Sequence, residues 1–262
     1  MQRRATYFLS DMHLGAKYFK EPREAEKRLV HFLDSIKHDA EAIYLVGDVL
    51  DYWFEYKYVV PRGYVRFFGK LAELSDSGVK ITWLIGNHDI WIFDYLPDEL
   101  GIEVIDGVLI RDVQGKKCFI THGDGVGEMS PAFRFIRGMF RNKICQKMYS
   151  WIHPRWTIPF AYGWSSKNRD THPLPQVYAG PGKESLVKFA TEYQAHHPEI
   201  DCYIFGHRHI ELEEHIPGGA IVYILGEWID NCSYARMVDG NITLHRFVEK
   251  QICHHKPSNE PA

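Results

Sequence analysis

Five short segments of the chain place acidic, amide and imidazole side chains directly after apolar runs. The segments read SDMH, GD, GNHD, THGD and GHRH. The candidate ligands among their residues are two aspartates, one asparagine and four histidines: Asp11, His13, Asp48, Asn87, His122, His207 and His209. Oxygen and nitrogen donors without any cysteine exclude a structural thiolate zinc site and favour Mn²⁺, Fe²⁺ or Zn²⁺. A metal centre is therefore our first hypothesis.

Seven ligands are too many for one metal ion that must keep positions open for water and substrate. Two ions that share one bridging carboxylate would account for all seven ligands. Such ions lie roughly 3.5–4 Å apart and activate a water molecule for attack at phosphorus. Any one of these residues alone would more often be structural, but five such segments in order argue against coincidence. The pattern favours hydrolysis of a phosphate ester or anhydride by two divalent metal ions, and we expect Mn²⁺ ahead of Fe²⁺ or Zn²⁺.

The apolar runs that precede these segments are typical of buried strands. They cover residues 5–9, 42–46, 79–85, 117–120 and 202–205. Helical stretches at 22–37 and 64–77 alternate with the first three runs, which predicts a parallel-rich sheet with covering helices. Ligand sites in such sheets gather at the carboxyl ends of the strands. Because side chains alternate along a strand, Asp-x-His and His-x-His in extended chain would also direct both side chains to one side.

The pattern changes after residue 100 to short strands joined by tight turns. The dipeptides at 114–115, 218–219 and 239–240 are Gln-Gly, Gly-Gly and Asp-Gly, which are hairpin signals. They indicate a second sheet packed on the first. A length of 262 residues fits one large α/β domain, or one domain with an insertion.

An acid-free stretch at 129–169 interrupts the strand pattern. It carries eight Lys and Arg residues and no Asp or Glu, with aromatic and aliphatic residues between them. Helical spacing fits much of it, so we expect a helical cap insertion, about 126–185, within a single domain of residues 1–262. Cations beside apolar surface would suit a substrate with a diphosphate and acyl chains. The alternative is an amphipathic insertion whose apolar face packs on the core and whose basic face is solvated.

Composition limits the partners and the compartment. Lys and Arg total 31 and Asp and Glu total 34, a net charge of −3, so nucleic acid is not the expected partner. Five scattered cysteines, an odd number, indicate a reduced, cytoplasmic protein. No apolar run approaches the ~18 residues of a membrane span. A basic amphipathic stretch can lie on an anionic membrane surface, so we expect peripheral contact with the inner face of the membrane.

The order D-x-H, GD-x-x-D, GNHD, HGD and GH-x-H resembles that of the calcineurin-like metallophosphoesterases. The resemblance implies a four-layer α/β-β/α sandwich of two packed mixed sheets with a helical cap. It also implies two metal sites: Asp11, His13, Asp48 and His209 for the first ion, and Asp48, Asn87, His122 and His207 for the second, with Asp48 bridging. His88 is not a ligand in that family and would face the phosphate or the leaving group. Asp51 would orient His88 and raise the basicity of its other ring nitrogen.

Within the family, the chain is similar to the UDP-2,3-diacylglucosamine hydrolases of lipid A synthesis. The similarity rests on SDMHLG, on THGDG before the basic region, on LGEW near residue 226 and on SSKNR at 165–169. It implies that the partner is a nucleotide-sugar lipid, cleaved at its pyrophosphate to UMP and an acylated sugar phosphate. The implied substrate contacts are Asn87, His88, Ser166, Lys167, Arg169 and His207. Well-studied members have GNRD where this chain has GNHD, and a Glu where it has Asp51.

Three other functions could use the same residues. A generic phosphodiesterase, a nuclease or a cyclic-nucleotide phosphodiesterase would need the same metals, but the basic stretch is dense with Phe, Trp and Ile. Ser/Thr protein phosphatases normally have GDxVDRG and GNHE, where this chain has GDVLDYW and GNHD. A metal centre that serves only structure would leave His88 without a purpose.

Overall fold

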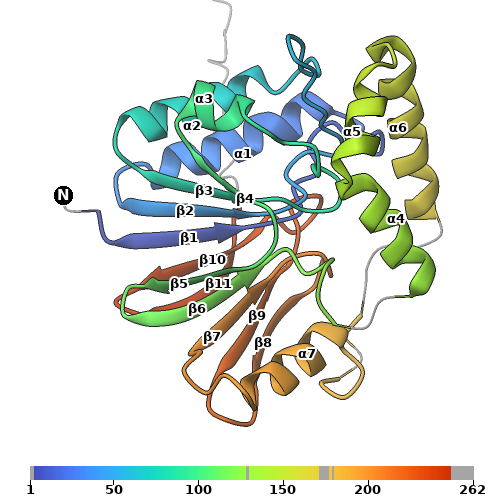
Figure 1. Ribbon diagram of the computed structural model, residues 1–262. Coiled ribbons are helices and arrows are strands. Elements are labelled where there is room, and N and C mark those ends of the chain that lie inside the picture. Colours follow the sequence, from blue (N-terminus) through green and yellow to red (C-terminus); the bar gives the residue numbers. More distant parts are fainter. Residues whose placement is uncertain (1–2, 128–129, 171–176, 179, 249–262) are drawn as a thin grey trace, which may run out of the picture.

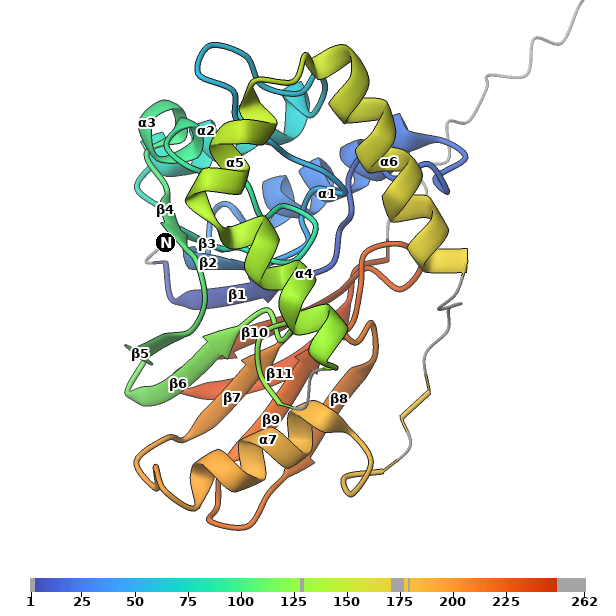
Figure 2. The same cartoon turned by 45° about the vertical axis from the view of Figure 1, so that its right-hand side comes forward.

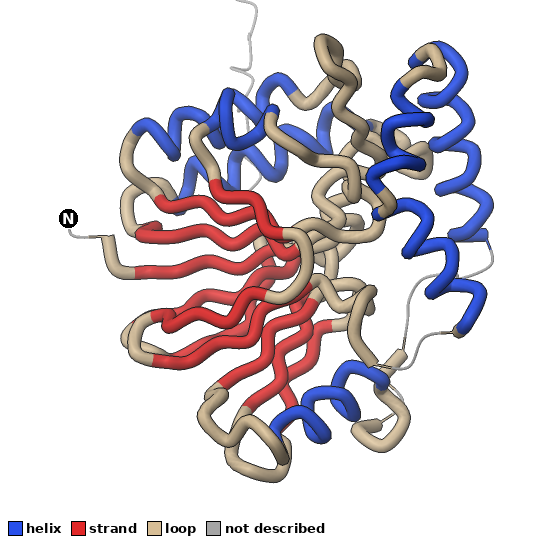
Figure 3. Tube along the Cα trace, in the orientation of Figure 1, coloured by secondary structure: helices blue, strands red, loops and turns tan. Residues whose placement is uncertain are grey.

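Two mixed β-sheets lie face to face in the computed structural model of the protein (Figures 1 and 3). The six-stranded sheet has the order β11 (Asn241–Arg246), β10 (Ser233–Val238), β1 (Ala5–Leu9), β2 (Ala40–Val46), β3 (Lys80–Leu84) and β4 (Glu103–Ile105). The five-stranded sheet has the order β5 (Leu109–Val113), β6 (Lys116–Thr121), β7 (Cys202–Phe205), β9 (Ile221–Leu225) and β8 (Glu211–His215). The structure describes residues 3–127, 130–170, 177–178 and 180–248, without the side chains of 164–170.

The central strands are parallel, and hairpins form three of the four sheet edges, at β5, β8 and β11. β1 to β4 pair in parallel, and so do β6, β7 and β9. The three predicted turns lie at β5–β6, β8–β9 and β10–β11. Gln114 and Gly115 both have positive φ, 49° and 79°, as a two-residue turn that matches the strand twist requires. The predicted strands, helices and second sheet are confirmed.

Helices cover both outer faces and complete four layers. Figure 1 shows α1 (Pro22–Ile36), α2 (Val65–Asp76) and α3 (Tyr95–Leu100) over the six-stranded sheet and α7 (Ser185–Gln194) over the other. α1 buries Leu29, Phe32, Leu33 and Ile36, the spacing of one helical face. Between the sheets, buried apolar side chains from both interdigitate, including Phe8, Val46, Leu84, Ile120, Ile204 and Leu225. This packing fixes the strand ends that carry the chemical segments.

Three further helices stand at the carboxyl ends of the strands (Figure 2). They are α4 (Pro131–Arg141), α5 (Lys143–Ser150) and α6 (Pro154–Asp170), and they fall within the predicted insertion at about 126–185. Ser130 and Asn142 accept hydrogen bonds from the first backbone N–H groups of α4 and α5 and so define where these helices begin. Among the described residues, no helix is long and apolar enough to cross a membrane.

Candidate metal centre

The five chemical segments meet at the carboxyl ends of β1, β2, β3, β6 and β7, but not in extended conformation. Asp11, His13, Asp48, His207 and His209 have φ values of 56°, 46°, 51°, 66° and 50°. Non-glycine residues rarely adopt this left-handed region, and where they do they tend to cluster at functional sites. The expectation that strand alternation aligns Asp-x-His and His-x-His is therefore wrong. The loops have already left the strand, and their own tight turns direct the side chains.

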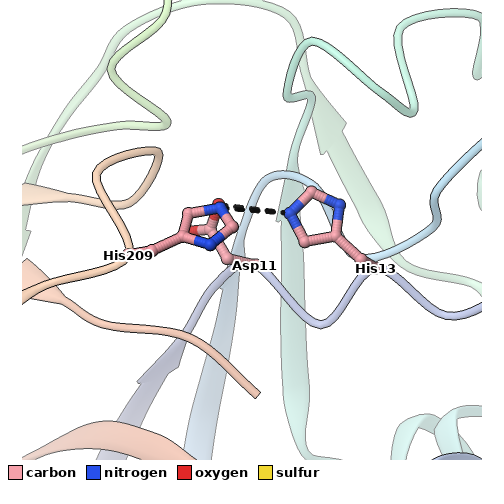
Figure 4. A group of neighbouring side chains, drawn as sticks. All are labelled: Asp11, His13 and His209. Carbon is pink, nitrogen blue, oxygen red and sulfur yellow. Dashed lines mark hydrogen bonds and ion pairs between the residues drawn. The ribbon is translucent and has the colours of Figure 1, made fainter. Parts of the chain in front are cut away.

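The first group of donors comprises Asp11, His13 and His209, whose ligand atoms all lie within 4.8 Å of one another. His209 Nε2 is 3.1 Å from Asp11 Oδ1 and 3.3 Å from His13 Nε2. Figure 4 shows the two rings with nitrogen atoms turned toward one another beside the Asp11 carboxylate. Asp11 Oδ1 is buried and has no hydrogen-bond partner in the described part of the chain. An orphaned buried carboxylate oxygen of this kind fits a cation ligand.

The second group comprises Asp48, His122 and His207, with Asn87 beside them. His122 Nε2 is 3.3 Å from Asp48 Oδ2 and 3.3 Å from Asn87 Oδ1. The other ring nitrogen of His122, Nδ1, lies 2.9 Å from the carbonyl oxygen of Val46. A proton on Nδ1 donated to this carbonyl leaves the Nε2 lone pair directed at the group, as a metal ligand requires.

Asp48 lies between the two groups. Its Oδ2 is 3.8 Å from His13 Nε2 on one side and 3.3 Å from His122 Nε2 on the other. Its Oδ1 accepts a hydrogen bond from the backbone N–H of His88 at 2.9 Å. One oxygen is therefore held by the loop and the other faces both groups, which is the geometry that a bridging carboxylate needs.

The charges of the centre suit cations. Burial alone would raise the pKa of Asp48, but the neighbouring His122, His88 and His13 hold it well below its usual range. Burial and the nearby charge of His122 lower the pKa of His207 to about 4, so its imidazole is neutral at pH 7. Burial alone would lower the pKa of His122, but the Asp48 carboxylate raises it well above its usual range, so this ring would lose a proton when its Nε2 binds a metal ion.

His88 and Asp51 lie beside the first group. His88 Nδ1 is 3.1 Å from the backbone carbonyl oxygen of Asp51 and 3.4 Å from its carboxylate. The same carboxylate oxygen is 3.7 Å from His13 Nδ1. Asp51 therefore faces a predicted ligand and the predicted catalytic histidine together. His88 keeps a side-chain exposure of 20%, against 2% for Asp51, so the histidine is the member of the pair that a substrate can reach.

Asp89 is a supporting residue to which the sequence reasoning gave no role. It is fully buried and accepts hydrogen bonds from Val49 N at 3.0 Å, Gly86 N at 2.8 Å and the Trp83 indole at 3.2 Å. Burial, and then the charge of Asp48, raise the pKa of Asp89 to about 6. Because these contacts tie the loop of Asn87 and His88 to the loop of Asp48, Asp89 fixes the relative positions of the two. The only hint of this role in the sequence is that Asp89 is the last residue of the GNHD segment.

Glu227 supports the loop of Asp11 from the LGEW segment. Its buried carboxylate accepts hydrogen bonds from Ile229 N, from Asp230 N at 2.9 Å and from Asn231 N at 2.9 Å. The turn closed in this way brings Trp228 N to within 3.1 Å of the carbonyl oxygen of Asp11. In the sequence, LGEW served only as a point of resemblance, without this role.

The predicted cap contacts Ser166, Lys167 and Arg169 lie in the last turns of α6, outside the residues whose side chains the structure describes. The base of the cap packs on the loop that follows β3. Trp91 donates to the carbonyl oxygen of Phe140 at 2.9 Å and stacks on Tyr149 with ring centroids 5.1 Å apart. Two basic residues of the acid-free stretch, Arg137 and Arg141, form ion pairs with acidic residues of the body.

Comparison with known proteins gives a consistent set of relatives. The family described as calcineurin-like phosphoesterase matches residues 5–211, a range that includes all seven predicted ligands. A protein of Porphyromonas gingivalis named UDP-2,3-diacylglucosamine hydrolase is 43% identical over 241 residues, 87% of this chain and 92% of that protein. A Neisseria meningitidis protein of the same name is 26% identical over 245 residues, 93% and 98% of the two chains. Among solved structures, a dimetal phosphatase from Danio rerio has a TM-score of 0.45 and 12% identity, over 94% of this chain and 99% of that chain.

Proposed function

Because the chain belongs to the calcineurin-like phosphoesterase family, it is a hydrolase that uses divalent metal ions, and we propose that it cleaves the pyrophosphate of UDP-2,3-diacylglucosamine. The products would be UMP and an acylated sugar phosphate. The observation that carries this proposal is the 43% identity, over most of both chains, to a protein named for that activity. We propose Mn²⁺ as the metal, with Fe²⁺ and Zn²⁺ as the alternatives that the same donors accept.

The proposed ligands are Asp11, His13, Asp48 and His209 for one ion and Asp48, Asn87, His122 and His207 for the other. When bound, such a pair activates a water molecule and neutralises charge on the phosphate that is attacked. The chain's own residues set the geometry. Asp48 holds the two groups at a fixed separation because its Oδ1 accepts a hydrogen bond from the backbone N–H of His88 at 2.9 Å.

His88 has the position of a proton donor. Its Nδ1 faces Asp51, which fixes the ring, and we place its Nε2 toward the substrate. As the bond between phosphorus and the bridging oxygen breaks, the leaving phosphate gains negative charge, and a proton held on Nε2 can be donated to it. Asn87 and His207 would contact the same phosphate from the metal side.

Exposed apolar side chains of the cap support a lipid substrate. Five large apolar side chains of α4–α6 are more than three-fifths exposed: Phe135, Ile144, Trp151, Trp156 and Phe160. Contiguous exposed apolar surface marks sites for ligands, partners or membranes, and five such side chains on three neighbouring helices could supply it. The alternative in which the apolar side of the cap packs on the core does not account for these residues. We propose that the cap takes the acyl chains and that its apolar and basic surface contacts the membrane peripherally.

Direct assay of the proposed substrate tests the function. The protein, loaded with Mn²⁺, is incubated with UDP-2,3-diacylglucosamine and UMP release is followed. A chromogenic phosphodiester and single-stranded DNA serve as comparison substrates. We expect UMP release to exceed hydrolysis of both by orders of magnitude in kcat/KM. Rapid hydrolysis of the diester or DNA without UMP release would instead support a generic phosphodiesterase or nuclease.

A further inference from the structure

Asp124 lies two residues after the predicted ligand His122 and contacts the cap. Its side chain is 4% exposed, and its Oδ2 accepts a hydrogen bond from Arg137 Nε at 2.9 Å. Arg141 Nη2, one helical turn later on α4, lies 3.6 Å from the same oxygen. Asp124 is absent from the groups of donors that could hold a metal among the described residues. Its Oδ2 is therefore directed at the cap, while its charge also acts on His122 and His207.

Arg141 extends these contacts to the other sheet. Its Nη1 is 3.0 Å from Asp106 Oδ1, directly after β4, whereas Asp124 follows β6. β4 belongs to the six-stranded sheet and β6 to the five-stranded sheet. Arg141 thus links α4 to the carboxyl ends of both sheets. We call the set of Asp106, Asp124, Arg137 and Arg141 the α4 clasp.

The clasp is the main polar attachment of a helix that has little apolar attachment of its own. Every residue of α4 is at least partly exposed, and none is buried. Besides the clasp, α4 is held through Phe140, by the hydrogen bond and ring contact to Trp91. The contact at Arg137 is close: a Cβ at Gly125 would lie 2.3 Å from Arg137 Nη2. The position of α4 therefore depends largely on one charge-assisted hydrogen bond, from Arg137 to Asp124, which is stronger than a neutral one. Arg141 adds ion pairs only, because its guanidinium nitrogens make no hydrogen bond in the described part of the chain.

We propose that Asp124 is a positioning residue which, through Arg137 and Arg141, holds the cap in the place where it receives the bulky part of the substrate. The substrate in this inference rests on the function proposed above, but the clasp itself does not. In this proposal Arg137 and Arg141, two of the eight basic residues of the acid-free stretch, hold α4 in place and do not bind the diphosphate. A small diester reaches the metal centre without the cap and should be indifferent to the clasp.

The test compares Asp124→Asn, Arg137→Ala, the double variant and Arg137→Lys. Arg134→Ala is the matched control, because Arg134 is on the same helix, is exposed and makes no ion pair among the described residues. We expect Asp124→Asn and Arg137→Ala to raise KM for the diacylated substrate by roughly tenfold or more, with small change in kcat. The double variant should add little to either single change, Arg137→Lys should recover part of the loss, and Arg134→Ala should behave as wild type. All should hydrolyse the small diester normally.

Amide hydrogen exchange across 131–141 and metal content supply readouts that do not depend on the substrate. The clasp predicts faster exchange in α4 for both single variants and two full equivalents of metal in each. Loss of metal in Asp124→Asn, with equal losses on both substrates, would overturn the proposal and make Asp124 a support of His122. Unchanged exchange in α4 would also overturn it. If UDP-2,3-diacylglucosamine is not a substrate at all, the exchange result still decides for or against the clasp.

Discussion

Each carboxylate of the candidate metal centre uses its two oxygens for different purposes. Asp11 Oδ2 accepts the backbone N–H of His207 at 2.9 Å, while Oδ1 faces His209. Asp48 divides its oxygens in the same way between the N–H of His88 and the two histidine groups. A carboxylate fixed through one oxygen presents the other with little loss of conformational freedom on binding. The backbone of one ligand loop thus orients the side chain of another.

Asp48→Ala should remove both metals, because Oδ2 faces both groups. We expect phosphoesterase activity to fall to background and the content of both ions to drop, as measured by elemental analysis after gel filtration. The fold should survive, since the change makes a buried side chain smaller and uncharged. Two full equivalents of metal in a folded Asp48→Ala protein would exclude a bridging role.

His88→Ala should separate chemistry from metal binding. His88 is reachable by substrate and lies outside both proposed ligand sets, so metal content should stay near two equivalents. Turnover should fall by about 10²–10⁴-fold, the usual contribution of a positioned acid. Asp51→Asn should give a smaller loss, since its backbone carbonyl still contacts His88. Loss of one metal in His88→Ala would show that His88 is a ligand and that this division of roles is wrong.

At the scale of elements, the sequence predicts the strands and hairpins because their signals are local. β1 at Ala5–Leu9 and β7 at Cys202–Phe205 have the predicted bounds, and the turn dipeptides lie where expected. The conformation of the ligand loops could not be predicted from strand alternation, since their left-handed residues are held by bonds to other loops. The roles of Asp89 and Glu227 are likewise set by N–H groups that only the folded chain gathers around them. The motifs alone were enough to propose the ligands, whereas the geometry of the proposed site needs the fold.

Gly86 shows how closely these loops approach one another. A Cβ at this position would lie 2.4 Å from the backbone nitrogen of Asp48, so Gly86→Ala must shift one loop against the other. A displacement of about 1 Å near a reacting centre can cost on the order of 10²-fold in rate. We expect a loss of that size, with weaker metal binding, measured by activity and metal titration.

Gly69→Ala is the control for this substitution. Gly69 lies within α2 and nothing is within 4 Å of the position that a Cβ would take. Alanine there should leave activity unchanged and stabilise the helix by about 0.5–1 kcal/mol. If Gly86→Ala behaves like Gly69→Ala, the two loops are not constrained at this contact.

At the scale of the whole molecule, the candidate centre joins the two sheets. Asp11, Asp48 and Asn87 follow strands of the six-stranded sheet, whereas His122 and His207 follow strands of the five-stranded one. Ions bound between them would crosslink the two halves of the sandwich. The cap adds a third part, because α4 touches the ends of both sheets.

Removal of the metals should therefore destabilise the whole fold and not only the loops. A ligand that binds the native state alone stabilises it by about 2.7 kcal/mol at 100 times its Kd. We expect a chelator to lower Tm by several degrees in a single transition, and Mn²⁺ to restore it. Asp48→Ala, which cannot hold the ions, should show no such response. A chelator-treated wild type with an unchanged Tm would mean that the ions do not link the sheets.

The cap predicts a difference between two apolar residues of the acid-free stretch. The side chain of Phe140 is partly buried against Trp91, whereas Trp151 is 75% exposed at the end of α5. Trp151→Asp should therefore keep the wild-type Tm and hydrolyse a small diester normally. On a diacylated substrate its kcat/KM should fall at least tenfold, because the lost binding free energy is on the order of that from burying one apolar side chain. Phe140→Asp should lower Tm and reduce both activities together, since it places a charge in a packed contact. Assays in detergent solution remove any contribution of membrane contact. Equal losses on the two substrates in a Trp151→Asp protein with normal Tm would exclude the acyl-binding role and leave the cap as a structural insertion.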